Sequence, residues 1–165
     1  MIRSILLCFL LAFQTLGFSQ ENITTLILIR HAEKGDDGTK DPDLTEVGKQ
    51  RSIRLMEMLK DQSIDAIFST KFKRTQQTVA PLAESKKLSV LTYEASKPGD
   101  IDAILSQYRG GTVVICGHSN SIPWTINYLV GKEQFKDFED KDYKNFVVVS
   151  VVEKGKVAKV TWLNY

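Results

Sequence analysis

The chain has 165 residues, of which 42% are apolar and 25% are charged, with 10 glycines and 4 prolines. This composition is typical of a globular protein, and it excludes collagen-like, low-complexity and intrinsically disordered chains. The formal net charge of +2 lacks the excess of lysine and arginine that marks a nucleic-acid-binding protein, so we expect no nucleic-acid partner. The two cysteines, Cys8 and Cys116, cannot form a disulfide framework.

The first 19 residues have the layout of a secretory signal peptide. Arg3 provides a positive start, residues 5–13 form an apolar run, and Gly17 and Ser19 place small residues before a cleavage site. The run is too short for a comfortable membrane span, so we expect cleavage near Ser19 and no stable membrane insertion afterwards. Residues 20–165 then form one domain that is exported, either to the periplasm or as a secreted protein. An uncleaved N-terminal anchor is the alternative.

Strand and helix patterns alternate along the predicted domain. We predict strands at residues 23–29, 66–68, 88–93 and 112–116, and helices at residues 44–60, 71–84, 100–108 and 121–129. The first and fourth of these strands have the continuous apolar pattern that is typical of strands buried on both faces of a parallel sheet. Thr45 and Ser121 are the expected N-caps, and Pro123 is tolerated in the first turn of the fourth helix. Pro81 should end or kink the second helix, and Gly131 should stop the fourth.

The C-terminal part of the chain has a different pattern. Residues 132–145 are densely charged, and we interpret them as a solvated connector. Residues 146–152 and 157–162 flank a short polar turn, which is the signal of a β-hairpin. The whole pattern predicts an α/β fold: a three-layer α/β/α domain with a mostly parallel central sheet and an antiparallel C-terminal edge hairpin.

The two histidines of the chain, His31 and His118, each closely follow an apolar strand. Ligands of open parallel sheets bind beyond the carboxyl ends of strands. If the two strands are adjacent, both imidazoles share one crevice. Arg30 ends the first strand, where a buried guanidinium needs an anion, and its planar fork suits either phosphate oxygens or a nearby carboxylate. Arg74 is a second candidate for phosphate binding, or else a solvated charge on a helix.

Four segments together resemble the histidine phosphatase superfamily, which also contains the cofactor-dependent phosphoglycerate mutases. Residues 28–33 resemble the signature around the first histidine, although Ala32 stands where many members have glycine, and residues 44–48 resemble the Leu-Thr-x-x-Gly that opens the first helix. The matches to the second segment are Ser69, Arg74, Gln77 and Thr78, and residues 117–120 resemble the segment with the second histidine. The short length is most similar to the phosphohistidine-phosphatase type. His118 is followed by Ser119, which disfavours the acid phosphatase and phytase branch.

The resemblance implies that His31 is the nucleophile and forms a phosphohistidine. Arg30, Arg74 and a protonated His118 then stabilise the charge of the phosphoryl group. Attack requires a neutral imidazole, and the other ring nitrogen of His31 should donate to a carbonyl or similar acceptor to fix the tautomer. The resemblance implies no cofactor and no metal, and we find no zinc-type spacing of His, Cys and carboxylates.

The family often places a general acid between the second arginine and the second histidine. Glu94 is our candidate, with Asp100 as the alternative. Glu33 is expected to orient its neighbours from the edge of the pocket, where it could also contact substrate, and Ser119 and Asn120 to donate hydrogen bonds to substrate.

These observations predict an exported, metal-independent phosphomonoesterase that acts on a small phosphorylated substrate. Two alternatives remain open: a phosphomutase, and a non-catalytic phosphate-binding protein of the same fold. An extracytoplasmic location and the short chain argue against the mutase, since mutases of this superfamily usually carry extra substrate-binding segments. Sugar phosphates, nucleotides, envelope saccharide phosphates and phosphoproteins are all compatible substrates.

Overall fold

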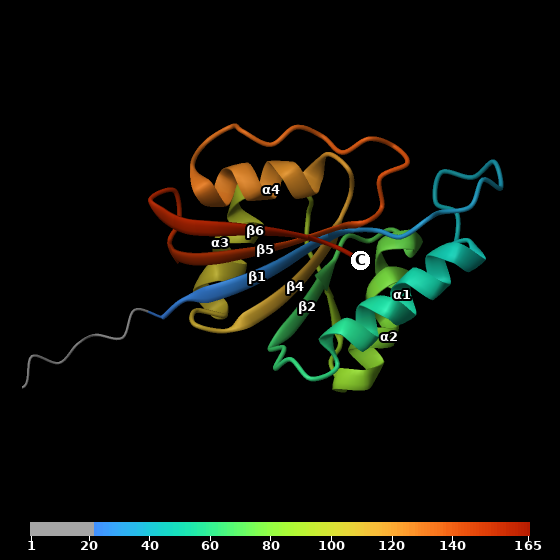
Figure 1. Ribbon diagram of the computed structural model, residues 1–165, viewed down its shortest axis with the longest axis horizontal. Helices are drawn as coiled ribbons and strands as arrows, with labels where there is room; N and C mark the ends of the chain where they lie inside the picture. Colours follow the sequence, from blue (N-terminus) through green and yellow to red (C-terminus); the bar gives the residue numbers. More distant parts are fainter. Residues whose placement is uncertain (1–21) are drawn as a thin grey trace, which may run out of the picture.

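A computed structural model describes residues 22–165 of the chain (Figure 1). The predicted signal peptide and its cleavage lie outside these described residues. The elements in chain order are β1 (Thr24–Arg30), α1 (Glu46–Leu59), β2 (Ala66–Ser69), α2 (Lys73–Lys86), β3 (Val90–Thr92), α3 (Pro98–Gln107), β4 (Thr112–Gly117), α4 (Ser121–Val130), β5 (Asn145–Glu153) and β6 (Val157–Asn164). Within residues 22–165, no helix is long and apolar enough to cross a membrane.

The six strands form one sheet in the order β3-β2-β4-β1-β5-β6. The first four strands of this order run parallel, whereas β5 is antiparallel to β1 and β6 is antiparallel to β5. The predicted mostly parallel sheet with an antiparallel edge hairpin is therefore confirmed. β1 and β4 are direct neighbours, with Arg30 in register with Gly117. The residues that follow these two strands consequently leave the sheet at the same edge.

Helices cover both faces of the sheet, which confirms the three-layer architecture (Figure 1). Alternate residues of a strand point to opposite faces. Leu28 and Ile115 belong to a core cluster with residues of α3 and α4, and Ile29 and Cys116 belong to a second cluster with residues of α1 and α2. β1 and β4 are apolar on both faces because both faces are covered.

Three local predictions differ from the structure. α2 continues past Pro81 to Lys86, because Leu82 and Ala83 beyond the proline are buried in the core and hold the last turns in place. Ser121 is the first residue of α4 and not its N-cap, since its hydroxyl accepts a hydrogen bond from the backbone N–H of His118 at 2.9 Å. The third strand, β3, covers only Val90–Thr92, whereas residues 88–93 were predicted. Thr45 does cap α1, and its side chain accepts from the N–H of Gly48.

Residues 132–144, hereafter the connector, join α4 to β5 by an irregular path. Most of its charged side chains are exposed, as predicted. It is nevertheless anchored to the domain, which a solvated connector would not be. The side-chain amide of Asn127 donates to the carbonyl of Phe135 at 2.8 Å, and the rings of Phe135 and Phe138 pack against Trp162. The backbone N–H of Phe138 also donates to the carbonyl of Ser119 at 2.9 Å.

Candidate active site

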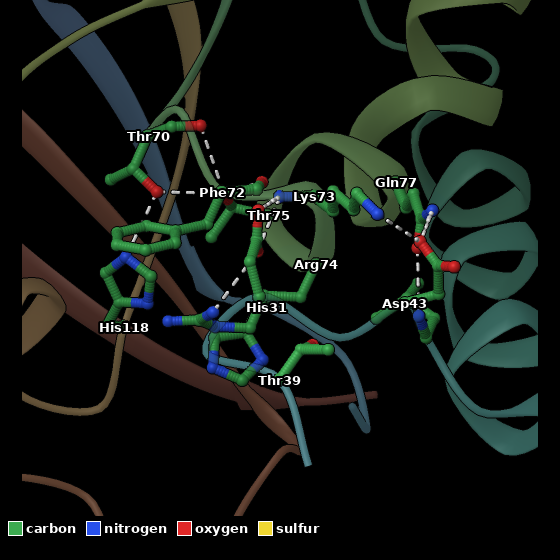
Figure 2. A network of polar contacts seen from close by, with 12 residues as sticks. His31, Thr39, Asp43, Thr70, Phe72, Lys73, Arg74, Thr75, Gln77 and His118 are labelled. Carbon is green, nitrogen blue, oxygen red and sulfur yellow. Dashed lines mark hydrogen bonds and ion pairs between the residues drawn. The ribbon is translucent and has the colours of Figure 1, made fainter. Parts of the chain in front are cut away.

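The two histidines meet beyond the ends of β1 and β4, as their positions in the sequence predicted. Their ring centroids lie 5.5 Å apart, in an edge-on arrangement. The backbone N–H of His31 donates to the carbonyl of Gly117 at 2.9 Å, which continues the β1–β4 pairing by one residue and fixes the spacing of the two segments. Figure 2 shows both imidazoles in one part of a network that also contains Thr70, Phe72 and Arg74.

The imidazole of His31 is buried and held in one orientation. Its Nδ1 lies 2.8 Å from the carbonyl oxygen of Ala32, so Nδ1 donates and Nε2 keeps its lone pair. Burial, together with the smaller effects of Arg30 and His118, lowers the pKa of His31 to about 3, although the Ala32 hydrogen bond acts in the opposite direction. His31 is therefore neutral at pH 7, which is the form that can attack phosphorus.

His118 is positioned by the segment after β2. Its Nε2 lies 3.0 Å from the hydroxyl of Thr70, and the ring of Phe72 stands edge-on to it with the centroids 5.2 Å apart. Burial, followed by the charges of Arg74 and Arg30, lowers the pKa of His118 to about 4. His118 is therefore neutral at pH 7 in the ligand-free site, and its protonation in the presence of a phosphoryl group stays a prediction. A bound phosphate dianion would offset the two guanidinium charges and favour protonation.

Arg30 is 4% exposed, and its partners are backbone carbonyls. Nη1 donates to the carbonyls of Glu139 at 2.8 Å and Asp142 at 3.1 Å, and Nη2 donates to the carbonyl of Asp140 at 3.0 Å. The ring of Tyr143 lies 4.3 Å from the guanidinium carbon. In the part of the chain that the structure describes, Nε is buried without a partner. Of the two partners that the sequence allowed, phosphate or a carboxylate, the carboxylate is replaced in the described chain by a cradle of backbone carbonyls.

Arg74 is not the solvated helix charge that the sequence allowed. Its side chain is 14% exposed and its guanidinium carbon lies 4.3 Å from the centre of the Phe72 ring. Its Nη1 makes a long ion pair with the carboxylate of Asp41, at 3.5 Å. Its Nε is also buried without a partner among residues 22–165. Two buried N–H donors beside two imidazoles form a site suited to a tetrahedral anion.

The segments that carry the family resemblance contact one another in space. The backbone N–H of Ala32 donates to the hydroxyl of Thr78 at 2.8 Å, and that hydroxyl donates to the carbonyl of Arg74 at 2.7 Å. A Cβ added to Gly48 would lie 2.2 Å from the carbonyl oxygen of Glu33. Only glycine therefore allows α1 to pack this closely on the backbone after His31. The four segments are parts of a single scaffold around the two histidines.

Glu94, the candidate general acid, lines a cavity of about 200 Å³ together with His118, Thr70 and Phe72. Asp100 is engaged elsewhere. Its carboxylate accepts from the backbone N–H of Glu94 at 2.8 Å and lies 3.1 Å from Lys97. The structure thus places Glu94 in the cavity and gives Asp100 a role in holding the backbone of Glu94.

The three remaining predicted residues lie around this site. The carboxylate of Glu33 pairs with Arg51 at 2.7 Å. Burial alone would raise the pKa of Glu33, but the hydrogen bonds from Arg51 outweigh it and lower this pKa. Such a paired carboxylate suits an orienting role. Ser119 and Asn120 directly follow His118, with Ser119 half-buried and Asn120 exposed. Their hydrogen bonds to substrate stay predictions.

Sequence reasoning did not identify Thr70 or Tyr143. Thr70 lies within the second family-like segment, and its hydroxyl is shared between Nε2 of His118 and the hydroxyl of Thr75 at 2.8 Å. Tyr143 lies in the connector, with its ring centroid 5.9 Å from that of His31. The signal that could have found Tyr143 is an aromatic residue among the charged residues of the stretch 139–144.

Part of the chain matches a known protein family. The family model of the histidine phosphatase superfamily (branch 1) matches residues 26–96. Phosphoserine phosphatase 1 of Hydrogenobacter thermophilus is 40% identical over 72 residues, which are 40% of this chain and 34% of that protein. The match thus spans about a third of the length of this curated relative.

Solved structures share the fold over most of both chains. Phosphoserine phosphatase of Entamoeba histolytica, in complex with 3-phosphoglyceric acid, has a TM-score of 0.67 at 18% identity, covering 86% of this chain and 97% of the other. The protein histidine phosphatase SixA, complexed with tungstate, has a TM-score of 0.66 at 19% identity, covering 84% of this chain and 94% of the other. At these identities the likeness shows the fold alone.

Proposed function

We propose that the chain is a histidine phosphatase, in line with the branch 1 family model that matches residues 26–96, and that it hydrolyses a small phosphomonoester through a phosphohistidine on His31. One observation carries this proposal: the neutral Nε2 of His31 lies beside His118 and near two guanidinium groups whose Nε atoms are buried without partners in the described chain. Nucleophile and cations are the two requirements of phosphoryl transfer to nitrogen.

The proposed reaction has two steps. In the first, Nε2 of His31 attacks phosphorus, the bond to the ester oxygen breaks, and the leaving oxygen takes a proton from Glu94. In the second, the Glu94 carboxylate takes a proton from water, the resulting oxygen attacks the phosphohistidine, and phosphate leaves with neutral His31 restored. Arg30, Arg74 and His118 stabilise the negative charge on the phosphoryl oxygens in both steps.

A small organic phosphate is the proposed substrate class. The cavity beside His118 has room for the leaving group of a small molecule, at about 200 Å³. Phosphoserine is the first compound to test, because the curated relative that matches this chain is a phosphoserine phosphatase. The same panel should contain an aryl phosphate, 3-phosphoglycerate and a phosphohistidine peptide.

The proposed location is outside the cytoplasm, and the support for it is the signal-peptide layout of residues 1–19. Cell fractionation with N-terminal sequencing tests this separately from activity. We expect a mature chain that begins near residue 20. Full-length protein in the cytoplasmic fraction would contradict the export proposal and leave the enzymatic one intact.

The decisive experiment compares wild-type protein with His31→Ala across the substrate panel. We expect His31→Ala to abolish hydrolysis, while Arg109→Ala, an exposed arginine that follows α3, keeps wild-type activity. Rapid acid-free quenching of wild type with labelled substrate should also trap label on the protein, stable to base and lost in acid. Full activity of His31→Ala would overturn the nucleophile assignment.

A further inference from the structure

The connector contacts Arg30 in a way that the reaction described above does not use. Three of its backbone carbonyls, those of Glu139, Asp140 and Asp142, accept hydrogen bonds from the two terminal nitrogens of the guanidinium. These contacts span more than a hundred residues of sequence, so they form only when the domain is folded. A guanidinium held by three acceptors has little rotational freedom.

The cradle determines which part of Arg30 remains available. A guanidinium has five N–H donors, one of them on Nε. Nη1 donates to two of the carbonyls and Nη2 to one, whereas Nε is buried and has no partner among residues 22–165. An unpaired buried donor is costly unless a ligand satisfies it. The cradle therefore leaves Nε, together with the second N–H of Nη2, as the donors through which Arg30 meets an anion.

Tyr143 completes the cradle and connects it to the nucleophile. Its ring lies 4.3 Å from the guanidinium carbon of Arg30, a distance at which a cation and an aromatic face attract each other. The same ring lies 5.9 Å from the imidazole of His31, inclined at 56°. Tyr143 thus packs against the cation and the nucleophile at once.

The connector is also tied to the second histidine. The N–H of Phe138 donates to the carbonyl of Ser119, the residue after His118, at 2.9 Å. Phe135, nearer the start of the connector, stacks on Trp162 of β6 and makes no contact with the cradle that the structure describes. The connector therefore extends from the His118 side of the site to Arg30. Phe135 anchors it to β6, away from the cradle.

We propose that Tyr143 is a positioning residue which, together with the carbonyl cradle of residues 139–142, fixes Arg30 so that Nε faces the phosphoryl group on His31. The proposal rests on the proposed function, since it assigns Tyr143 a part in the same reaction. Tyr143 acts through Arg30 and not by touching the reacting atoms. Its aromatic face is the property that matters, and the hydroxyl is dispensable.

The experiment compares three variants of the full chain: Tyr143→Leu, which keeps an apolar side chain but removes the aromatic face; Tyr143→Phe, which keeps the face; and Phe135→Leu, which makes the same change elsewhere in the connector. We expect Tyr143→Leu to lower kcat on the order of tenfold with a smaller change in KM. Tyr143→Phe and Phe135→Leu should stay within about twofold of wild type. Thermal unfolding confirms that each variant is folded.

Calorimetric binding of orthovanadate and of inorganic phosphate separates this proposal from the proposed function. If Arg30 is positioned for the transition state, Tyr143→Leu weakens vanadate binding more than phosphate binding, and Phe135→Leu changes neither. If no variant hydrolyses any phosphate ester but this binding pattern holds, the enzymatic function fails and the positioning role stands. If wild type is active and Tyr143→Leu matches it in kcat and in vanadate affinity, the positioning role is overturned. A loss shared equally by Tyr143→Leu and Phe135→Leu also overturns it, because the effect then belongs to the connector as a whole.

Discussion

The two segments that flank the histidine pair are built in opposite ways. Residues 69–78, which follow β2, reach the site through side chains: Thr70 contacts His118, Thr78 accepts from the backbone of Ala32, and Arg74 supplies a cation. The connector reaches it through backbone carbonyls and a single aromatic ring, that of Tyr143. Both segments hold a guanidinium close to His31. Only residues 69–78 do so with side chains, which a sequence motif can identify.

This difference determines how each segment responds to mutation. A hydrogen bond from a side chain disappears when that side chain is truncated, and a buried partner is then left unsatisfied. A backbone carbonyl survives almost any substitution, because every residue supplies the same oxygen. The segment at 69–78 should therefore be sensitive at single positions, whereas the cradle should tolerate changes in the residues that form it.

The largest effect among the remaining predictions is expected at Arg74. Arg74→Ala removes a preorganised cation, and we expect a loss of roughly 3 kcal/mol of transition-state stabilisation, on the order of a hundredfold or more in kcat/KM. Lys73→Ala is the matched control, since Lys73 is the preceding residue and is exposed. The measurement is steady-state hydrolysis of the best substrate of the panel. A loss below tenfold for Arg74→Ala would show that this segment contributes through packing and not through charge.

A smaller effect, on stability, is expected at Thr78. The Thr78 hydroxyl accepts from Ala32 N–H and donates to the Arg74 carbonyl, and it is fully buried. Thr78→Val keeps the volume and removes both bonds, so we expect the free energy of unfolding to fall by about 1–3 kcal/mol. Urea unfolding measures this, and Thr78→Ser, which keeps the hydroxyl, should lose clearly less. Equal losses in the two variants would assign the effect to packing.

The fold was largely predictable because its determinants repeat along the chain. The doubly buried strands β1 and β4, the Thr45 cap and the hairpin turn each follow from local patterns of apolar and polar residues. The errors arose where distant packing outweighs a local signal. Pro81 lacks an N–H, but burial of Leu82 and Ala83 beyond it carries α2 onward.

The candidate site was predictable to the extent that it depends on side chains. His31, His118 and Arg30 converge because the parallel neighbours β1 and β4 end together, and Arg74 reaches them from α2. The connector was interpreted only as a solvated segment, since nothing in a charged sequence tells that its carbonyls will bind Arg30. The charge state of His118 could not be predicted from the sequence either, because burial, the main cause that lowers its pKa to about 4, is a property of the folded chain.

The smallest effect on activity is expected at Glu139 and Asp140. These two positions test whether the connector acts through its backbone, in contrast to residues 69–78. The backbone carbonyls of both residues accept hydrogen bonds from Arg30, but both residues are exposed. The double substitution Glu139→Ala and Asp140→Ala keeps both carbonyls and removes only solvated charge, so we expect kcat/KM within about twofold of wild type. Screening by salt should make even that difference vanish at high ionic strength. A tenfold loss that persists in high salt would mean that these side chains hold Arg30 directly, and that the connector, like residues 69–78, acts through what its sequence encodes.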